Sequence, residues 1–285
     1  RNVVDFVTSR AGAGVVVASV PLPIATAEEV VERVMERVTS RTRLALLDHV
    51  ASPTAVIFPI EELVRRLDGR GVDTLVDGAH GPGMLPLALD RLGAAYYTGN
   101  CHKWLCAPKG AGFLHVRRDR QEGICPAVIS HGYSHRRPER PPLHEAFDWT
   151  GTDDPTPWLS VAEAIRFCEG LVDGGLEALM RRNHQLALTA QQILCDRLGV
   201  APSCPDAMLG SMAALRLPGK TDSACDRIHP LRTHPLQESL QERFGIEVPV
   251  YHWPAPPHTL VRISAHAYNA PGQYHRLADA LEELM

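Results

Sequence analysis

The feature that most constrains this chain of 285 residues is the alternation of short apolar runs with stretches of helical periodicity. The runs are rich in apolar and β-branched residues and most are followed by turn-forming residues, which is typical of buried strands. Strands that alternate with helices predict a mostly parallel sheet covered on both faces. The expected strands are 14–23, 43–50, 72–80, 94–99 and 110–116.

Helix signals lie between these runs. Residues 1–12 have a helical pattern, and Thr26 with Glu29 has the spacing of a capping box at the start of a second helix. Pro59 suits the first turn of a third helix, because a proline there loses no hydrogen bond. These signals support an α/β arrangement.

The pattern changes after Asp153. Ser160 and Glu163 again have capping-box spacing, and a long helical stretch follows at 176–198. Three strands and a C-terminal helix follow that stretch and predict a smaller α+β unit. They are 210–217, 246–253, 259–265 and the helix from Pro271.

Composition and charge exclude several classes of function. The formal net charge is −4, so the chain has no electrostatic signature for nucleic acid or for an anionic membrane. No apolar run approaches the roughly 20 residues that a membrane-spanning helix needs. The seven Cys form no CxxC pair, which argues against a disulfide framework and a zinc site. We expect a cytoplasmic protein with reduced thiols, no metal and a small-molecule substrate.

Polar residues gather where the expected strands end, which is where open α/β sheets bind ligands. Asp77 ends one strand, and Lys103 stands between His102 and Trp104 shortly after another. Taken alone, Asp77 before Gly78 equally fits a turn. A lysine can also simply extend its amine to the surface.

Asp77 and Lys103 together have a more specific meaning. A lysine amine whose pKa is lowered by burial or by nearby charge can form a Schiff base (aldimine). Pyridoxal 5'-phosphate needs such a lysine and a carboxylate at its pyridinium nitrogen. It also needs hydrogen-bond donors for its phosphate, and Asn100 and His102 are candidates. The pair therefore predicts pyridoxal phosphate as the cofactor.

The motifs around these residues resemble those of the class V aminotransferases, which are fold-type I pyridoxal-phosphate enzymes. The likeness is greatest to the isopenicillin N epimerase-like branch. It is carried by "LVDGAHGPG" with "YYTGNCHKWLCAPKGAGFL", "HVASPTAVIFPI", "FDWTGTDDP" and "VRISAHAYNAPGQY". The resemblance implies a mostly parallel sheet of the seven-stranded type in a large domain at 1–172, followed by a smaller α+β domain at 173–285.

The resemblance also implies a role for each matching residue. Lys103 would bind the cofactor covalently, and Asp77 would pair with its pyridine nitrogen. His80 and Ser52 would approach the 3-oxygen of the ring. The remaining implied positions are Asn100 and His102 at the phosphate, Gly151 and Thr152 at the phosphate of the other subunit of a homodimer, and Arg262 at the substrate carboxylate.

The implied activity is a reaction at the α-carbon of an amino acid. The substrate amine would displace Lys103, and the freed amine would then act as acid and base. Asp77 would keep the pyridine nitrogen protonated, so that the ring can accept electrons. We expect an epimerase-like enzyme. The alternatives are a C–S lyase acting on a cysteine conjugate and a catalytically silent scaffold subunit of the same fold.

Two departures from the family pattern matter. Family members carry a phosphate-binding turn and a ring-stacking aromatic or His before the region where this chain starts, so we expect that an N-terminal portion is missing. Cysteine desulfurases carry a nucleophilic Cys shortly before the carboxylate-binding Arg. Here residues 245–261 contain no Cys, and Cys225 lies further upstream. Persulfide chemistry is therefore disfavoured.

Overall fold

The computed structural model describes residues 2–134, 137–219 and 233–285, so Cys225 lies outside the described residues. These residues form a four-stranded sheet of order β1-β2-β3-β4 and a three-stranded sheet of order β5-β7-β6. The strands are β1 Leu44–Asp48, β2 Asp73–Gly78, β3 Tyr96–Asn100, β4 Gly112–Val116, β5 Met212–Arg216, β6 Val250–His252 and β7 Thr259–Ser264.

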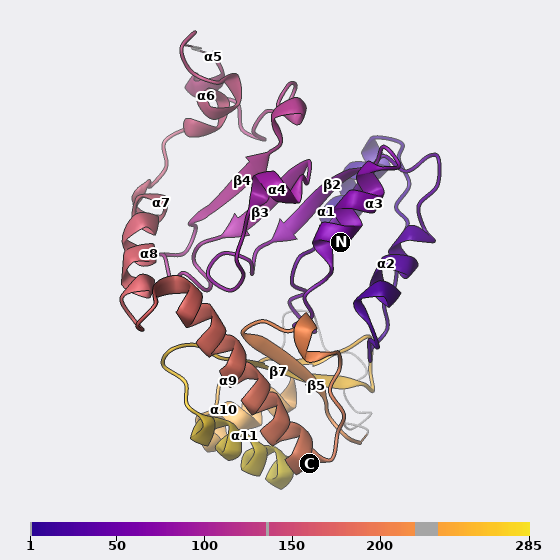
Figure 1. Ribbon diagram of the computed structural model, residues 1–285, viewed down its shortest axis with the longest axis vertical. Coiled ribbons are helices and arrows are strands. Elements are labelled where there is room, and N and C mark those ends of the chain that lie inside the picture. Colours follow the sequence, from indigo (N-terminus) through magenta and orange to yellow (C-terminus); the bar gives the residue numbers. More distant parts are fainter. Residues whose placement is uncertain (1, 135–136, 220–232) are drawn as a thin grey trace.

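Helices lie beside both sheets, and α9 runs from the first sheet to the second (Figure 1). The longer helices are α1 Asn2–Arg10, α2 Ala27–Met35, α3 Ile60–Asp68, α8 Val161–Glu169, α9 Gly175–Leu198, α10 Pro235–Phe244 and α11 Pro271–Leu284. The short ones are α4 Leu89–Leu92, α5 His131–Ser134, α6 Pro142–Asp148 and α7 Thr156–Leu159. Among the described residues, no helix combines the length and the apolar character needed to cross a bilayer.

The first sheet confirms the mostly parallel arrangement. β1, β2 and β3 are parallel, whereas β4 runs antiparallel to β3. It has four strands in the described part of the chain, fewer than the seven-stranded type that the resemblance implies. The parallel register sets Asp48 beside Asp77 and Asp77 beside Thr98, so polar residues meet at the carboxyl ends of the strands.

The run 14–23 was predicted as a buried strand, and this prediction is wrong. The segment has no regular secondary structure, and Val16 and Val17 are 68% and 52% exposed. Its prolines have no N–H to donate to a ladder. The segment is instead anchored just after its end, where the Ile24 N–H donates to the Ser203 carbonyl at 2.9 Å. An apolar composition favours a strand only where a neighbouring strand supplies hydrogen-bond partners.

The expectation that helices cover both faces of the first sheet also needs correction. Leu44 and Leu46 lie on the same side of β1 and are each 50% exposed, whereas Leu47 on the opposite side is buried. Helix α3 packs on β2, and its side chains share a core with Leu47. In the described residues the strands of this sheet thus resemble half-buried strands, with one face in the core.

The capping predictions had different outcomes. The Thr26 hydroxyl accepts a hydrogen bond from the Glu29 N–H at 3.2 Å, and the Glu29 carboxylate accepts one from the Ala25 N–H, which confirms the cap of α2. Ser160 does precede α8, but its side chain makes no cap. Its hydroxyl donates to the Thr156 carbonyl at 2.7 Å, because the preceding turn of α7 is within reach.

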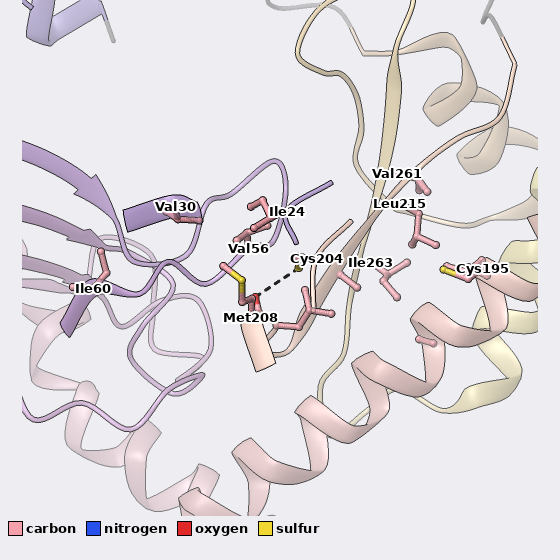
Figure 2. Packing of buried hydrophobic residues seen from close by; sticks show 14 of the residues in the cluster. Ile24, Val30, Val56, Ile60, Cys195, Cys204, Met208, Leu215, Val261 and Ile263 are labelled. Carbon is pink, nitrogen blue, oxygen red and sulfur yellow. Dashed lines mark hydrogen bonds between the residues drawn. The ribbon is translucent and has the colours of Figure 1, made fainter. Parts of the chain in front are cut away.

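Apolar side chains from both sheets pack into a shared core. Val30 and Ile60 come from helices beside the first sheet, while Leu215 and Ile263 come from strands of the second (Figure 2). Met208 lies between these groups and is 4% exposed. The continuous core positions residues of β7 close to the ends of β1 and β2.

Tyr97 determines the shape of the turn that follows β2. Its side chain is fully buried, and its hydroxyl lies 2.9 Å from the His49 Nδ1 atom. A Cβ atom at Gly78 would lie 2.0 Å from the Tyr97 ring, and one at Gly81 would lie 2.4 Å from its hydroxyl. The glycines in "DGAHG" are therefore required so that the chain can pass over this tyrosine.

We expect Gly78→Ala to lower the free energy of unfolding by about 1–3 kcal/mol, because the added methyl group overpacks against Tyr97. Gly14→Ala is the matched control, since a Cβ atom there meets nothing within 4 Å. Urea denaturation of both variants measures the difference. Equal stabilities would contradict this explanation of the motif.

Candidate active site

The site is centred on the carboxyl ends of β2 and β3. Asp77 is exposed at the end of β2, and one of its carboxylate oxygens accepts a hydrogen bond from the Ala79 N–H at 3.0 Å. The turn interpretation and the ligand interpretation of Asp77 are thus compatible. One oxygen orders the turn, and the carboxylate lies exposed at the sheet edge.

His80 stands at the bottom of this turn and is 8% exposed. Its Nε2 atom lies 3.2 Å from the Lys103 Nζ atom, and its Nδ1 atom accepts from the Trp104 indole N–H at 3.2 Å. Burial, and then the positive charges of Lys103 and Arg262, lower the pKa of His80 to about 3. The imidazole is therefore neutral at physiological pH.

Lys103 is half-buried in the turn after β3. Burial lowers the pKa of its amine, the Arg262 charge lowers it further, and the Asp77 carboxylate opposes both. A lysine with a lowered pKa has a larger fraction of nucleophilic free amine. This turn packs closely against the segment at Gly83. A Cβ atom at Gly83 would lie only 2.7 Å from the Trp104 carbonyl carbon.

Arg262 reaches this site from β7 of the second sheet. Its Nη1 atom donates to the Ser52 carbonyl at 2.7 Å and to the Ser52 hydroxyl at 3.0 Å. Its Nε atom is buried and has no hydrogen-bond partner among the residues that the structure describes. Such an unsatisfied buried donor is costly unless a ligand accepts from it. Ser52, predicted at the cofactor's 3-oxygen, thus lies against the arginine.

The two predicted phosphate donors, Asn100 and His102, directly precede Lys103 in the chain. Asn100 ends β3 opposite Gly112. The His102 Nδ1 atom lies 3.1 Å from the Ala111 carbonyl, and because a carbonyl only accepts, Nδ1 carries the hydrogen. The Nε2 atom of His102 can therefore donate to a phosphate only when the ring is protonated.

Gly151 and Thr152 stand apart from this group. They lie in the loop between α6 and α7, and Gly151 has a φ of 133°, a conformation that favours glycine. Figure 1 shows α5 and α6 extending away from the sheets. Among the described residues no hydrogen bond or ion pair connects this loop to Lys103 or Asp77. Their assignment to the other subunit's phosphate stays a prediction.

The sequence analysis gave no role to two contacts of the site. Trp104, which donates to His80, was named only as the neighbour of Lys103, although that adjacency was the available signal. The hydrogen bond between His49 and Tyr97 was also missed, and burial lowers the pKa of His49 to about 4. Nothing in the sequence pairs residues 48 positions apart.

The residues present fit pyridoxal phosphate. An amine with a lowered pKa, a carboxylate at the end of a strand and a buried imidazole surround one point, which matches the chemistry this cofactor requires. The Arg262 Nε atom, which has no partner among the described residues, is chemically suited to a carboxylate.

The sequence profile described as "Aminotransferase class-V" matches residues 5–271. The chain belongs to the class V aminotransferase family. This confirms the resemblance inferred from the motifs, and family membership supports pyridoxal phosphate as the cofactor. The chain covers 61% of the length of two curated relatives described below, so it spans less than two thirds of those proteins.

Curated relatives of two kinds match the chain. It is 39% identical to isopenicillin N epimerase of Streptomyces clavuligerus over 86% of the chain. It is 33% identical to the probable chloroplastic L-cysteine desulfhydrase of Arabidopsis thaliana over 100% of the chain. The relatives thus include an epimerase and a probable C–S lyase, which are the first two activities considered from the sequence.

Solved structures show the same fold. The cysteine desulfurase CsdA of Escherichia coli matches with a TM-score of 0.72 and 21% identity, covering 98% of this chain and 67% of that one. A C-DES variant with glycine covalently linked to the PLP cofactor matches with a TM-score of 0.70 and 21% identity, covering 88% and 63%. These matches confirm the fold-type I class.

The buried His80 predicts a specific pH dependence of stability. Unfolded, its pKa is about 6.5, whereas in the folded protein it is about 3. Between these values the unfolded state binds more protons, so the free energy of unfolding falls as the pH falls. From about pH 7 to about pH 5, His80 contributes a loss of about 2 kcal/mol.

Urea denaturation at the two pH values measures this loss. His80→Gln removes the titrating group. The variant should therefore lose about 2 kcal/mol less than the wild type between pH 7 and pH 5. An identical pH dependence in both proteins would contradict the assignment of a neutral buried ring.

Proposed function

We propose that this protein is a pyridoxal-phosphate enzyme that acts at the α-carbon of an amino acid, in the manner of isopenicillin N epimerase. The observation that carries the proposal is the placement of the Lys103 amine, 3.2 Å from the His80 ring and under the influence of both Asp77 and Arg262. Family membership and the 39% identity to an epimerase support it.

Each residue of the site has a distinct task in this proposal. Pyridoxal phosphate supplies an electron-accepting ring that stabilises the carbanion at the α-carbon. Lys103 would hold the cofactor, and its amine would move a proton at the α-carbon of the substrate. Asp77 holds the pyridine nitrogen protonated through its charge. His80 donates to the 3-oxygen, and Asn100 and His102 hold the phosphate.

Arg262 orients the substrate through its carboxylate. Ser52 accepts hydrogen bonds from the Nη1 atom, whereas the Nε atom has no hydrogen-bond partner among the described residues. A guanidinium edge with two parallel N–H groups suits bidentate binding of a carboxylate. Fixing the carboxylate leaves the bond from the α-carbon to hydrogen in a set direction relative to Lys103.

The runner-up is a C–S lyase that acts on a cysteine conjugate. The identity of 33% to a probable L-cysteine desulfhydrase favours this alternative. Both reactions begin with removal of the α-proton, so the same residues serve both. A catalytically silent scaffold subunit is the third alternative, and the combination of Asp77, Lys103 and Arg262 argues against it. A persulfide mechanism stays disfavoured, because residues 245–261 contain no Cys.

We also propose a homodimer in the cytoplasm. Large apolar side chains are exposed on α7 and α8, among them Trp158 at 56%, Leu159 at 61% and Phe167 at 62%. A cluster of this kind suits a subunit interface. It lies on the chain next to Gly151 and Thr152, which the proposal assigns to the partner's phosphate. The division into domains at 1–172 and 173–285 belongs to the same proposal.

We expect the purified protein to develop an absorption band at about 420 nm when pyridoxal phosphate is added, because the cofactor binds covalently to a lysine. Lys103→Ala should abolish the band. Lys109→Ala is the matched control, because Lys109 is an exposed lysine of the same segment, and its band should be unchanged. A protein that stays colourless with added cofactor would refute the proposed enzyme.

We expect Arg262→Lys to raise KM for the amino-acid substrate by roughly 10- to 100-fold, because lysine keeps the charge but loses the bidentate contact. Steady-state kinetics measure the change. Arg216→Lys, on the neighbouring strand β5, is the control and should leave KM unchanged. An unaltered KM in Arg262→Lys would remove Arg262 from substrate binding.

The reaction type is decided by incubating single enantiomers of candidate amino acids with the enzyme in heavy water. Inversion with uptake of solvent deuterium at the α-carbon is the outcome expected for an epimerase. Release of pyruvate or another oxo acid together with a thiol would favour the C–S lyase instead.

A further inference from the structure

We propose that Trp104 is a positioning residue that holds His80 in the tautomer with its hydrogen on Nε2, so that His80 presents an N–H group to the Lys103 amine. The geometry of this contact is independent of the reaction. Only its catalytic consequence rests on the proposed function.

The donor and acceptor chemistry of indole fixes the tautomer. The Trp104 Nε1 atom carries a hydrogen and can only donate. It lies 3.2 Å from the His80 Nδ1 atom, and both side chains are buried, with Trp104 at 7% and His80 at 8% exposure. Nδ1 must therefore accept, and a neutral ring then carries its hydrogen on Nε2. The lowered pKa of His80 keeps the ring neutral.

The tautomer has a consequence for Lys103. The His80 Nε2 atom lies 3.2 Å from the Lys103 Nζ atom, and its hydrogen needs an acceptor. A neutral amine has a lone pair and can accept, whereas an ammonium group has only donors. The contact therefore favours the free amine and would place two N–H groups face to face if Lys103 were charged.

Other charged groups around Lys103 act in both directions. Arg262 on β7 disfavours the ammonium form, as burial does, whereas Asp77 at the end of β2 favours it. The His80 tautomer also disfavours the ammonium form. Its effect comes from a hydrogen bond rather than from net charge, so a mutation at Trp104 can test it separately from the effects of Arg262 and Asp77.

Contacts from both sheets hold the Trp104 indole in place. The His266 ring stacks on it, with ring centroids 6.1 Å apart and an angle of 11° between the planes. His266 Nδ1 accepts from the Ala267 N–H, which leaves Nε2 facing the Trp104 carbonyl at 3.4 Å. The close approach of Gly83 restricts the same backbone from the other side.

This arrangement prepares the lysine for covalent chemistry. A free amine already has the electron pair that bonds to a carbonyl carbon, so no proton has to leave first. After Lys103 has reacted, the His80 N–H is available to an oxygen at the same point. Trp104 acts on both events through His80 and touches neither reactant itself.

The first test is the tautomer itself, measured without cofactor. Long-range proton–nitrogen correlation spectra of histidine-labelled protein at about neutral pH distinguish the two neutral tautomers, and His80→Gln assigns the signal. We expect the Nε2-protonated pattern in the wild type and its loss in Trp104→Phe. Trp253→Phe, at an exposed tryptophan directly after β6, should leave the pattern unchanged.

The wild-type spectrum alone can overturn the proposal. A His80 ring that is charged or protonated on Nδ1 at neutral pH refutes it, whether or not Trp104→Phe folds. Circular dichroism shows whether the variant is folded before its spectrum is compared.

The second test is the reactivity of Lys103 toward acetic anhydride as a function of pH, read by mass spectrometry. In Trp104→Phe the His80 ring can carry its hydrogen on Nδ1 instead. Its Nε2 atom then accepts a hydrogen bond from Lys103, so the ammonium form of Lys103 becomes more stable. We expect the pH of half-reaction to rise by about 0.5–1 unit, with Lys109 as the internal reference. An unchanged value would refute the influence on Lys103.

These results are separable from the proposed function. If pyridoxal phosphate gives no absorption band, the proposed enzyme fails while the tautomer measurement stands. If the band forms but the tautomer is the other one, the role of Trp104 fails and the cofactor site stands.

Discussion

The parallel register of β1, β2 and β3 is the constraint on which the rest of the structure depends. It brings the carboxyl ends of the three strands to one edge, with Asp48, Asp77 and Thr98 in adjacent positions. The turns that leave this edge then meet, and so His80 and Lys103 come within hydrogen-bond distance. An antiparallel arrangement would send alternate strand ends to opposite edges and would separate these groups.

Burial and hydrogen bonding give the meeting point its chemical character. Neutral His80 and half-buried Lys103 lie where solvent cannot stabilise two positive charges, and the pKa of each is lowered. Asp77 lies at the exposed end of its strand. Arg262 comes from the other sheet and is hydrogen-bonded to Ser52, so its position depends on the core between the sheets.

Much of the fold follows from local patterns. The strands that flank the site and the long helix α9 lie close to the residues expected for them, because their periodicity and caps agree with their surroundings. The strand predicted at 14–23 was wrong, because strand formation also requires a neighbouring strand, which an apolar run cannot specify. The cap predicted at Ser160 was also wrong, because its hydroxyl donates to a carbonyl of α7 instead.

The sequence by itself determined the types of residue in the site and, through their motifs, the family. It assigned Lys103 and Asp77 because this cofactor's chemistry demands an amine and a carboxylate, and the family resemblance added Arg262. Only the tertiary structure decided that Ser52 holds the arginine and that Trp104 holds His80. Those pairings depend on distances between segments far apart in the chain, and residue identity carries no information about such distances until the core has formed.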